Sequence, residues 1–520
     1  MLHYSGKIWK LTIGFMLVVN FSFAQLSSLH DQQLWIKADD RFEYGDYLNA
    51  LQIYTQLNHI DSTQEEIIFK MGVCNFNIRP YRKTSIAYFN KVNPSHFPET
   101  NYYLGRLYAL NRQYDKAIEY FKVYKGRNKE MEYTVEEVQN LIDKCNTAKE
   151  FEANKREPVR IENLGKNINT SYSEYAPLID ENEDYLLFTS RRENETHPKM
   201  DPLGQYFEDI YASKKNGGDW GPPVLLDTII NTPLHDACTG LSADGKRLLI
   251  YRTSPDLKSG DIYESIFDGS NYSTPVIIPT NVNSKKYAET SACFSPDNNT
   301  VFFSSDRPGG YGGKDIYFMK KLSNGKWGTP FNLGPIINTP FNEDAPFVHP
   351  LNNTLFFSSE GHKNMGGFDI FKSNFSEEGN FTEPENLGSP INTSDDDIFF
   401  VLNKNGTVGY FSSEREGGFG SQDIYKATFV PPLSLNVYHA TAVDKENNPV
   451  AKAELTLMEM NTSKIIGIYR PNSTTRKMLI ISKSGEYKVQ IVAPGFETFT
   501  GAIKLGADME LTYTLTEQIK

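Results

Sequence analysis

The stretch Ser-Ser-Asp-Arg-Pro-Gly-Gly-Tyr-Gly-Gly-Lys-Asp-Ile-Tyr at residues 304–317 contains the feature that decides the fold. Its last three residues, or Asp-Ile-Phe in their place, occur five times, beginning at Asp209, Asp261, Asp315, Asp369 and Asp423. The successive intervals are 52, 54, 54 and 54 residues. A regular period of about 50 residues indicates a repeat architecture.

Each copy of the repeat contains the signals of four short strands. A first strand follows Ile-Asn-Thr or a variant, and a second is typified by residues 301–305. A glycine-rich turn then leads to the Asp-Ile-Tyr strand, and Trp-Gly-x-Pro introduces an outer strand. Because four short strands per repeat are typical of a propeller blade, residues 156–432 are predicted to form a five-bladed β-propeller.

The two ends of this segment predict how the ring closes. Residues 161–170 match residues 330–339, which are an outer strand with its exit, yet they precede the first blade. After the fifth repeat Pro431-Pro432 breaks the chain and no outer strand follows. We therefore expect residues 159–164 to complete the fifth blade beside residues 424–429, which leaves no open sheet edge.

Residues 25–155 contain a shorter, helical repeat. Ala38, Gly72 and Gly105 are spaced by 34 and 33 residues, and the same spacing separates Tyr47, Tyr81 and Tyr114. The small residue allows the two helices of a unit to approach closely, and the tyrosine opens the second helix and packs between them. This resembles three tetratricopeptide repeats, whose period is about 34 residues.

Two further expectations concern this helical region. An extra residue near Thr84 predicts a shifted second helix in repeat two, and a long polar helix at residues 134–154 is expected to cap the stack. The repeat register directs Asp39, Asn77 and Arg106 toward the concave groove, where an extended peptide or a partner helix would bind.

Residues 433–520 are predicted to form a small β domain. Residues 443–457 contain a strand, a polar turn and an alternating strand, and residues 485–496 contain a strand that ends in a turn. Both stretches resemble the carboxypeptidase regulatory-like, transthyretin-like β-sandwich, a module that has no catalytic residues.

The N-terminus and the composition indicate where the protein is located and which partners are disfavoured. Lys7 and Lys10, an apolar run at residues 11–23 and a small residue at Ala24 predict a cleaved secretory signal at residues 1–24. No later segment is long and apolar enough to span a membrane. The net charge of −12 argues against nucleic acid, whose binding depends on neutralising phosphates. The four cysteines are expected to be free, buried thiols.

The sequence contains no His-Glu-x-x-His, Cys-x-x-Cys or Gly-x-Ser-x-Gly motif of the kind that marks catalytic sites. The glycine-rich turns imitate phosphate-binding loops, but they connect strand to strand, so they are interpreted as turns. The repeated Asp of Asp-Ile-Tyr could bind calcium with its turn. We favour a structural role in which its carboxylate accepts backbone N–H groups. No cofactor or metal is expected.

A set of carboxylates is the principal candidate binding site. Each stands just before the predicted innermost strand of its blade: Glu174, Asp236, Glu289, Glu343 and Asp397. They would ring one mouth of the central channel and attract a cation or a basic partner segment. The alternative, which we weigh more heavily, is that each carboxylate caps its own turn.

The first blade contains nine extra residues between Ser190 and Asp209. This polar insertion begins with Arg191 and Arg192 and includes His197. It is either a contact loop for a partner or a tolerated surface insertion.

The order of these modules resembles one known family. A signal peptide, tetratricopeptide repeats, a propeller of the TolB-like PD40 kind and a regulatory-like domain follow one another in Bacteroidota envelope proteins related to the type IX secretion component PorE. Those relatives continue into an OmpA-like domain that this chain does not show, so peptidoglycan contact is not carried over.

The resemblance implies a non-enzymatic periplasmic adaptor, associated with the outer membrane, that binds other envelope proteins of a secretion or gliding system. The alternative is a soluble protein that binds a sugar, peptide or cell-wall ligand at the propeller mouth. A propeller hydrolase would need an acid/base pair at that mouth.

Overall fold

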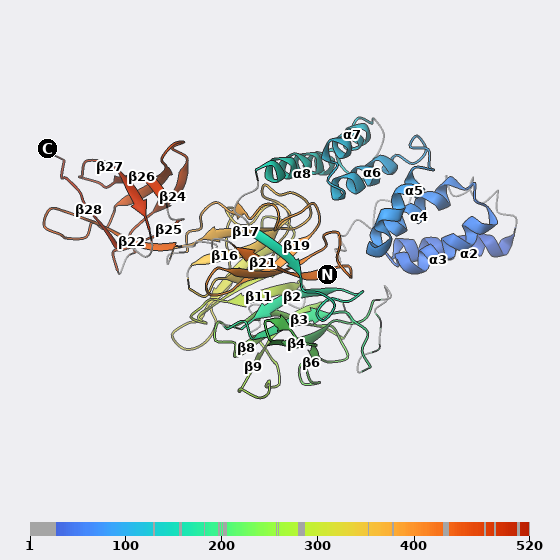
Figure 1. Ribbon diagram of the computed structural model, residues 1–520, viewed down its shortest axis with the longest axis horizontal. Helices are drawn as coiled ribbons and strands as arrows, with labels where there is room; N and C mark the ends of the chain where they lie inside the picture. The colour runs from blue at the N-terminus through green and yellow to red at the C-terminus, as the bar shows by residue number, and fades with distance from the viewer. Residues whose placement is uncertain are drawn as a thin grey trace. The chain divides into compact units, whose positions relative to one another are not determined.

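The computed structural model describes residues 28–127, 131–154, 159–180, 182–195, 198, 200, 205–255, 257, 259–278, 287–351, 353–376, 379–429, 436–472, 475–482, 485–506 and 510–518. They form a helical region, five small sheets and a C-terminal β region (Figure 1). The expected signal, residues 1–24, lies outside these ranges. Within them, no helix is both long enough and apolar enough to cross a membrane.

The described part of the N-terminal region contains seven α-helices: α2 (Leu29–Glu43), α3 (Tyr47–Ile60), α4 (Glu65–Asn77), α5 (Ser85–Phe89), α6 (Glu99–Leu110), α7 (Tyr114–Lys125) and α8 (Val135–Ala153). The Ser28 hydroxyl accepts a hydrogen bond from the Asp31 N–H, and the Asp46 carboxylate accepts one from the Asn49 N–H. These caps begin α2 and α3.

Two glycines permit the close packing that the sequence predicts. A Cβ atom at Gly72 in α4 would lie 2.8 Å from the ring of Phe89 in α5, and one at Gly105 in α6 would lie 2.5 Å from the ring of Phe121 in α7. Any larger residue would force these helices apart. The role predicted for the small repeat residue is therefore confirmed at both positions.

Repeat two departs from the pattern as expected. Its second helix starts as a 3-10 helix, Arg79–Thr84, and continues as the five-residue α5. One part of the prediction was wrong: Tyr81, expected to pack between the helices, is 42% exposed. It lies on the 3-10 turn, where three residues per turn direct it away from the face that Tyr47 and Tyr114 occupy at the start of α3 and α7.

Five four-stranded antiparallel sheets follow as the blades of a propeller. In blades one to four the chain runs from the innermost strand outward. Blade one contains β2 (Glu174–Ile179), β3 (Tyr185–Ser190), β4 (Asp209–Asn216) and β6 (Val224–Leu225), and a short β5 (Asp219–Trp220) pairs with the end of β4. Blade two contains β7 (Asp236–Leu241), β8 (Arg247–Thr253), β9 (Gly260–Ile266) and β10 (Val276–Ile277).

Blades three to five repeat this arrangement. Blade three contains β11 (Glu289–Phe294), β12 (Thr300–Ser305), β13 (Asp315–Lys320) and β14 (Phe331–Asn332). Blade four contains β15 (Glu343–Val348), β16 (Thr354–Ser359), β17 (Asp369–Asn374) and β18 (Glu385–Asn386). Blade five contains β19 (Asp397–Leu402), β20 (Val408–Ser413), β21 (Asp423–Phe429) and, as its outermost strand, β1 (Val159–Asn163).

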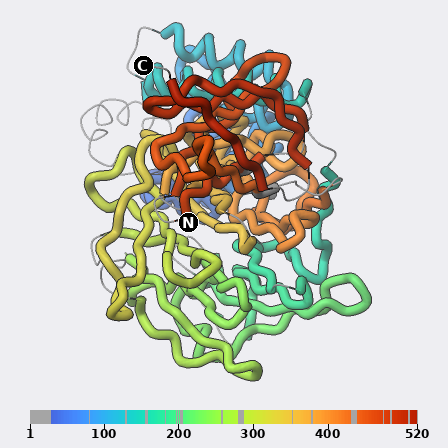
Figure 2. The backbone as a smooth tube through the Cα atoms, turned by 90° about the vertical axis from the view of Figure 1, so that its left-hand side faces the viewer, coloured from blue at the N-terminus to red at the C-terminus, as the bar shows by residue number. Residues whose placement is uncertain are grey.

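The ring closes as the sequence predicts. The innermost strands contact one another in the order β2, β7, β11, β15, β19 and again β2. Strand β1 pairs antiparallel with β21, with Val159 opposite Phe429 and Asn163 opposite Tyr425. In Figure 2 the colour passes round the blades from teal through yellow to orange, and the orange end lies beside the teal start.

The recurrent Asn of the Ile-Asn-Thr exit explains why this motif repeats. In blade three the Asn338 side chain accepts a hydrogen bond of 2.7 Å from the Ile316 N–H and donates one of 3.0 Å to its carbonyl. Asn169 makes the same pair of bonds to Ile424, across the closure of the ring. A side-chain amide thereby bonds to the backbone of the third strand at the point where the short outer strand ends.

The C-terminal β region contains two sheets that share one core. The strands are β22 (Asn436–Val443), β23 (Glu454–Glu459), β24 (Ile465–Tyr469), β25 (Met478–Ser482), β26 (Gly485–Val492), β27 (Phe499–Leu505) and β28 (Glu510–Thr514). One sheet has the order β25-β22-β28 and the other β24-β23-β26-β27. Ala440 and Ala442 of the first sheet pack with Leu455 and Ile491 of the second. The predicted strands of this region are confirmed.

The four cysteines, Cys74, Cys145, Cys238 and Cys293, are free and buried, as expected.

Candidate functional site

Each of the five candidate carboxylates begins the innermost strand of its blade, and all five are 0% exposed. Glu343 accepts hydrogen bonds from the N–H of Thr339 at 2.8 Å and from its hydroxyl at 2.6 Å. Glu174, Asp236 and Asp397 make the same bonds to the threonine four residues before them. These four carboxylates therefore close the turns that carry the chain into blades one, two, four and five.

Arginines accompany four of the five carboxylates. The nitrogen–oxygen distances are 3.3 Å for Arg192–Glu174, 2.5 Å for Arg252–Asp236, 3.0 Å for Arg307–Glu289 and 2.8 Å for Arg415–Asp397. Burial raises the pKa of Glu174, Asp236 and Asp397, and the neighbouring arginine opposes that rise. Pairing with a guanidinium reduces the cost of burying these charges.

Blade four departs from this arrangement. Gly361 stands two residues after Ser359, where Arg307 and Arg415 follow the equivalent serines. Nε2 of the next residue, His362, donates a hydrogen bond of 2.8 Å to the carbonyl of Ile337. Among the described residues no cation pairs with Glu343, and burial raises its pKa to about 6.

The structure corrects the expected acidic mouth. Glu174, Asp236, Glu289, Glu343 and Asp397 do not present their charges to the channel, because the adjoining turns and serines bury them. The Ser190, Ser305 and Ser359 hydroxyls each donate to the carboxylate of their own blade. The geometry thus favours the alternative in which each carboxylate caps its own turn.

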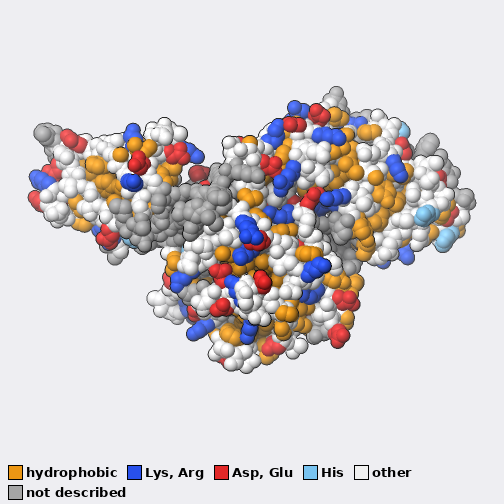
Figure 3. Space-filling view, viewed as in Figure 1, with side chains coloured by type: hydrophobic (Ala, Val, Ile, Leu, Met, Phe, Trp, Pro, Cys, Tyr) orange, Lys and Arg blue, Asp and Glu red, His pale blue; other side chains and the backbone are white. Residues whose placement is uncertain are grey.

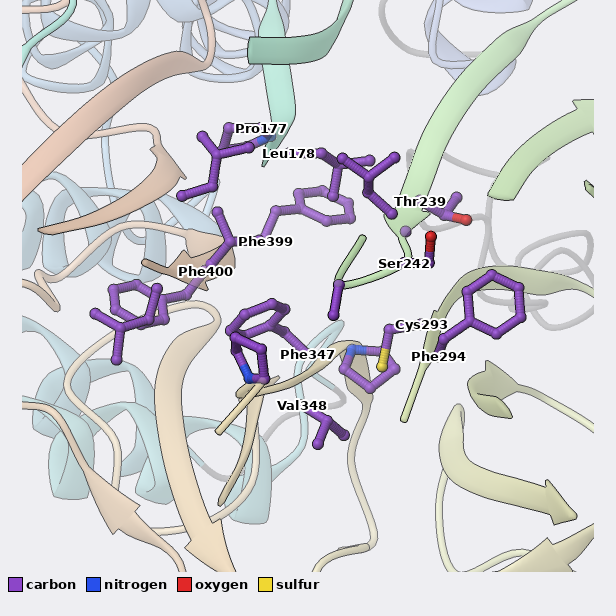
Figure 4. A pocket seen from close by; sticks show the side chains of 18 of the residues that line it. Pro177, Leu178, Thr239, Ser242, Cys293, Phe294, Phe347, Val348, Phe399 and Phe400 are labelled. Carbon is purple, nitrogen blue, oxygen red and sulfur yellow. The ribbon is translucent and has the colours of Figure 1, made fainter. Parts of the chain in front are cut away.

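The central channel is filled largely by apolar side chains. All five innermost strands line a cavity of about 70 Å³, with Leu178, Cys293, Phe347 and Phe399 around it (Figure 4). Pockets that bind small organic ligands typically enclose about 300 Å³ or more. A space of this size accommodates water, and a sugar or peptide would require the phenylalanines to move.

The repeated Asp of Asp-Ile-Tyr pins the glycine-rich turn. Asp315 accepts hydrogen bonds from the N–H groups of Tyr311 at 2.7 Å and Gly312 at 3.1 Å, and from the Asn332 amide at 2.6 Å. A Cβ atom at Gly310 would lie 2.5 Å from this carboxylate, so a side chain there would collide with it. The geometry favours the structural role over calcium binding. No group of His, Cys, Asp and Glu suited to a metal occurs among the described residues.

The insertion in blade one begins with two arginines that point inward. Arg191 pairs with Glu208 at 2.7 Å. Arg192 pairs with Glu174, donates to the Ile168 carbonyl at 2.6 Å and lies 4.7 Å from the ring centroid of Tyr211. The interpretation of Arg191 and Arg192 as partner-binding residues was therefore wrong, because both side chains are used inside the blade. His197 lies outside the described residues.

Sequence reasoning missed a buried polar cluster between blades one and two. Besides Arg191, the Glu208 carboxylate contacts the Tyr175 hydroxyl, and its Oε2 lies 3.4 Å from Nδ1 of His235. Burial opposes ionisation of Glu208, but Arg191 and His235 outweigh it and hold its pKa well below the usual range. The only sequence signal for this cluster was a charged residue directly before Asp209, at the position that Lys314 occupies in blade three.

The three candidates of the helical region do not form one cluster. Asp39 of α2 bonds to the Tyr54 hydroxyl at 2.6 Å and to Nζ of Lys70 at 2.8 Å, so it joins α2, α3 and α4. Asn77 is exposed and donates to the Val73 carbonyl of its own helix. Arg106 donates to the Tyr102 hydroxyl at 3.0 Å and lies 5.7 Å from the ring centroid of Phe76. Asp39 and Arg106 are half-buried.

Comparisons with known proteins yield fold-level likeness alone. No family model matches the chain, and no curated protein matches it. Among solved structures, a glycoside hydrolase is 9% identical, with 54% of this chain and 94% of that chain covered and a TM-score of 0.39. A protein assigned as TolB from Agrobacterium tumefaciens is 15% identical over 53% and 98% of the two chains, with a TM-score of 0.29. The tricorn protease is 11% identical over 64% and 32%, with a TM-score of 0.29.

Proposed function

We propose that this protein is a non-enzymatic adaptor of the bacterial cell envelope that binds other envelope proteins. The observation that carries the proposal concerns the outer strands of the blades. Val224, Val276 and Phe331 occupy the same position in blades one, two and three and are 68%, 67% and 59% exposed. We take these recurring exposed apolar side chains, one on the outer strand of each of three blades, as the points at which other proteins bind.

The interior of the propeller supports the same proposal. Its carboxylates and arginines are engaged with one another in the turns, and its channel encloses about 70 Å³. A ligand at the mouth, the alternative function, gains no support from this geometry. On the face that Figure 3 presents, acidic and basic side chains are interspersed, and the chain carries a net charge of −12, so nucleic acid is disfavoured as a partner.

The proposed cellular location of the protein, and the secretion or gliding system to which we assign it, rest on the order of its modules. We propose that the helical region is tetratricopeptide-like, that the C-terminal region is carboxypeptidase regulatory-like, and that the protein is exported to the periplasm and associates with the outer membrane. By family resemblance, its partners belong to a type IX secretion or gliding system. Sequencing the N-terminus of the protein recovered from cells tests export: Gln25 should be the first residue, and an uncleaved Met1 would contradict it.

The adaptor proposal is tested by co-purification. The protein is tagged after Lys520, crosslinked in whole cells and isolated, and bound proteins are identified by mass spectrometry. The triple variant Val224→Ser, Val276→Ser, Phe331→Ser should lose partners that the wild type retains. Glu385→Gln, at the same position in blade four, is the matched control and should retain them.

Recovery of envelope proteins by the wild type and by the control, but not by the triple variant, supports the proposal. Recovery of no envelope protein above background by the wild type refutes it. A thermal-shift screen with cell-wall sugars and peptides then tests the alternative, which predicts that one such ligand raises the melting temperature.

A further inference from the structure

A groove lies where the ring closes, between blades five and one. It encloses about 320 Å³, within the range of ligand-binding clefts. It lies between the exit of β1, the β4–β5 hairpin and the middle strands of blade five, and its lining includes Glu162, Lys166, Lys215, Trp220, Tyr410 and Lys426. None of these residues belongs to the sites described above.

The equivalent junction between blades three and four is filled by phenylalanines. The ring centroids are 5.8 Å apart for Phe331 and Phe318, and 6.3 Å for Phe318 and Phe302. Phe302 lies 5.9 Å from Phe375, which lies 5.2 Å from Phe381. Four aromatic rings thus fill that junction up to the hairpin of blade four, and Phe331, 59% exposed, stacks on them from the outer strand of blade three.

The groove contains the same five positions with different chemistry. Lys426 follows Asp423 by three residues, as Phe318 follows Asp315, and the two pair in the same way with the outer strand. Matched one by one with Phe331, Phe318, Phe302, Phe375 and Phe381, the residues of the groove are Glu162, Lys426, Tyr410, Lys215 and Trp220. The junction between blades three and four shows that apolar residues can fill all five positions. Charged residues also occupy some of them elsewhere: Lys372 and Glu385 form an ion pair in blade four, and Lys321 pairs with Trp327 in blade three.

The charges of the groove favour an anion. Among the described residues, neither Lys166 nor Lys426 takes part in an ion pair. Nζ of Lys215 lies 4.0 Å from Glu183, while Glu162 is paired with Arg160 at 2.8 Å. The lining holds three lysines against two carboxylates, Glu162 and Asp219, in a chain whose net charge is −12. A concave site with an excess of positive charge concentrates anions.

The lining also narrows the class of ligand. Phosphate sites commonly use an arginine or a helix N-terminus. Neither lies among the described residues of the groove. Trp220 is only 7% exposed, because Tyr410 and Lys215 cover it, so its ring face is not open to a sugar. Separate ammonium groups on flexible stems suit separate carboxylates.

We propose that this groove binds an acidic segment of another polypeptide, with Asp or Glu carboxylates paired to Lys166, Lys215 and Lys426. The inference rests on the adaptor proposal only in assigning the segment to a partner protein. The binding chemistry is independent of which cellular partners exist.

Fluorescence anisotropy with fluorescein-labelled hexaglutamate tests the groove on the purified protein at low salt, with labelled hexaglutamine as the neutral peptide. We expect hexaglutamate to bind. The double variant Lys215→Gln, Lys426→Gln should weaken binding about tenfold, because it removes two exposed ion pairs with the peptide. Lys321→Gln with Lys372→Gln alters the same repeat positions in blades three and four. That control should leave the affinity within about twofold, and added salt should weaken wild-type binding.

Three results would overturn the inference: no hexaglutamate binding by the wild type, equal binding by the double variant, or binding of oligogalacturonate in place of hexaglutamate. A positive result together with failed co-purification would refute the adaptor and leave the groove intact. The two proposals therefore fail separately.

Discussion

The side-chain amide of Asn163 donates a hydrogen bond of 2.7 Å to the carboxylate of Asp423, 260 residues further along the chain. Within blade three the equivalent bond joins Asn332 to Asp315, only 17 residues apart. The same local contact thus serves as the closing contact of the ring when its two residues come from opposite ends of the propeller. Closure also removes the free edge of β21.

Asn169→Ala should destabilise the closure. It removes two hydrogen bonds to the backbone of Ile424, and we expect the free energy of unfolding to fall by about 2–3 kcal/mol. Asn338→Ala removes the same bonds inside blade three and should cost about the same. Only Asn169→Ala should produce aggregation that depends on protein concentration, measured by light scattering during heating. Equal aggregation of both variants would contradict this.

Gly420→Ala should be one of the most damaging single substitutions in the propeller. A Cβ atom there would lie 1.5 Å from the Tyr172 carbonyl oxygen, a backbone atom that cannot swing aside. We expect a loss of roughly 4 kcal/mol or more, read from chemical denaturation. Gly325→Ala is the control: its φ is +78° but nothing lies within 4 Å, so it should cost only about 1 kcal/mol. Similar losses would refute the steric argument.

The fold was predictable because the same side-chain-to-backbone hydrogen bonds recur from blade to blade. Among the described residues, an Asp pins the turn in blades three, four and five, and an Asn bonds to the isoleucine backbone of blades one, three, four and five, so these residues recur at a fixed period. The displaced outer strand was visible for the same reason, since it contains the same Asn and Ile-Asn-Thr exit. The position of Tyr81 was predicted wrongly because the type of helix decides where its side chain points, and the repeat alignment does not report helix type.

The candidate sites were less predictable because burial and pairing depend on neighbours. The sequence places Glu174 and Glu343 alike, yet Arg192 pairs with Glu174, whereas blade four has Gly361 in place of the arginine and no cation among the described residues pairs with Glu343. An arginine two residues after the serine in blades one, three and five was a visible signal that the carboxylates would be paired. The closure groove had a weaker signal, a lysine at 426 where blade three has Phe318.

Lys70→Ala should strongly destabilise the helical region. Its buried Nζ lies 2.8 Å from Asp39 and 2.9 Å from Glu66, so Lys70→Ala leaves two carboxylates together without their cation. We expect a loss of about 3–5 kcal/mol in urea unfolding. Lys116→Ala, at an exposed cation above the ring of Tyr108, should change the stability far less, because solvent screens that contact. A Lys70 variant as stable as the Lys116 variant would contradict this.

Asp344→Asn should destabilise blade four at neutral pH. Burial opposes ionisation of Asp344, but Lys314 at 2.8 Å and the Ser291 hydroxyl outweigh it and lower its pKa to about 2. A lowered pKa stabilises the fold above the unfolded value of about 3.8, and this contribution is lost as the pH falls through 2. We expect about 3 kcal/mol of destabilisation at pH 7 that shrinks toward pH 2. A loss independent of pH would contradict the ion-pair explanation.

The neighbouring Glu343 should show the opposite pH dependence. Its pKa is raised to about 6 by burial, so its proton stabilises the fold below the unfolded value of about 4.5, and this contribution is lost as the pH rises through 6. The wild type should therefore lose about 2 kcal/mol across that interval from this group. Glu343→Gln cannot ionise, so its free energy of unfolding should rise relative to wild type by about that amount between pH 4.5 and 6.5, measured by urea denaturation. A constant difference across this interval would mean that Glu343 keeps an ordinary pKa, and that polar groups of its turn replace the missing arginine.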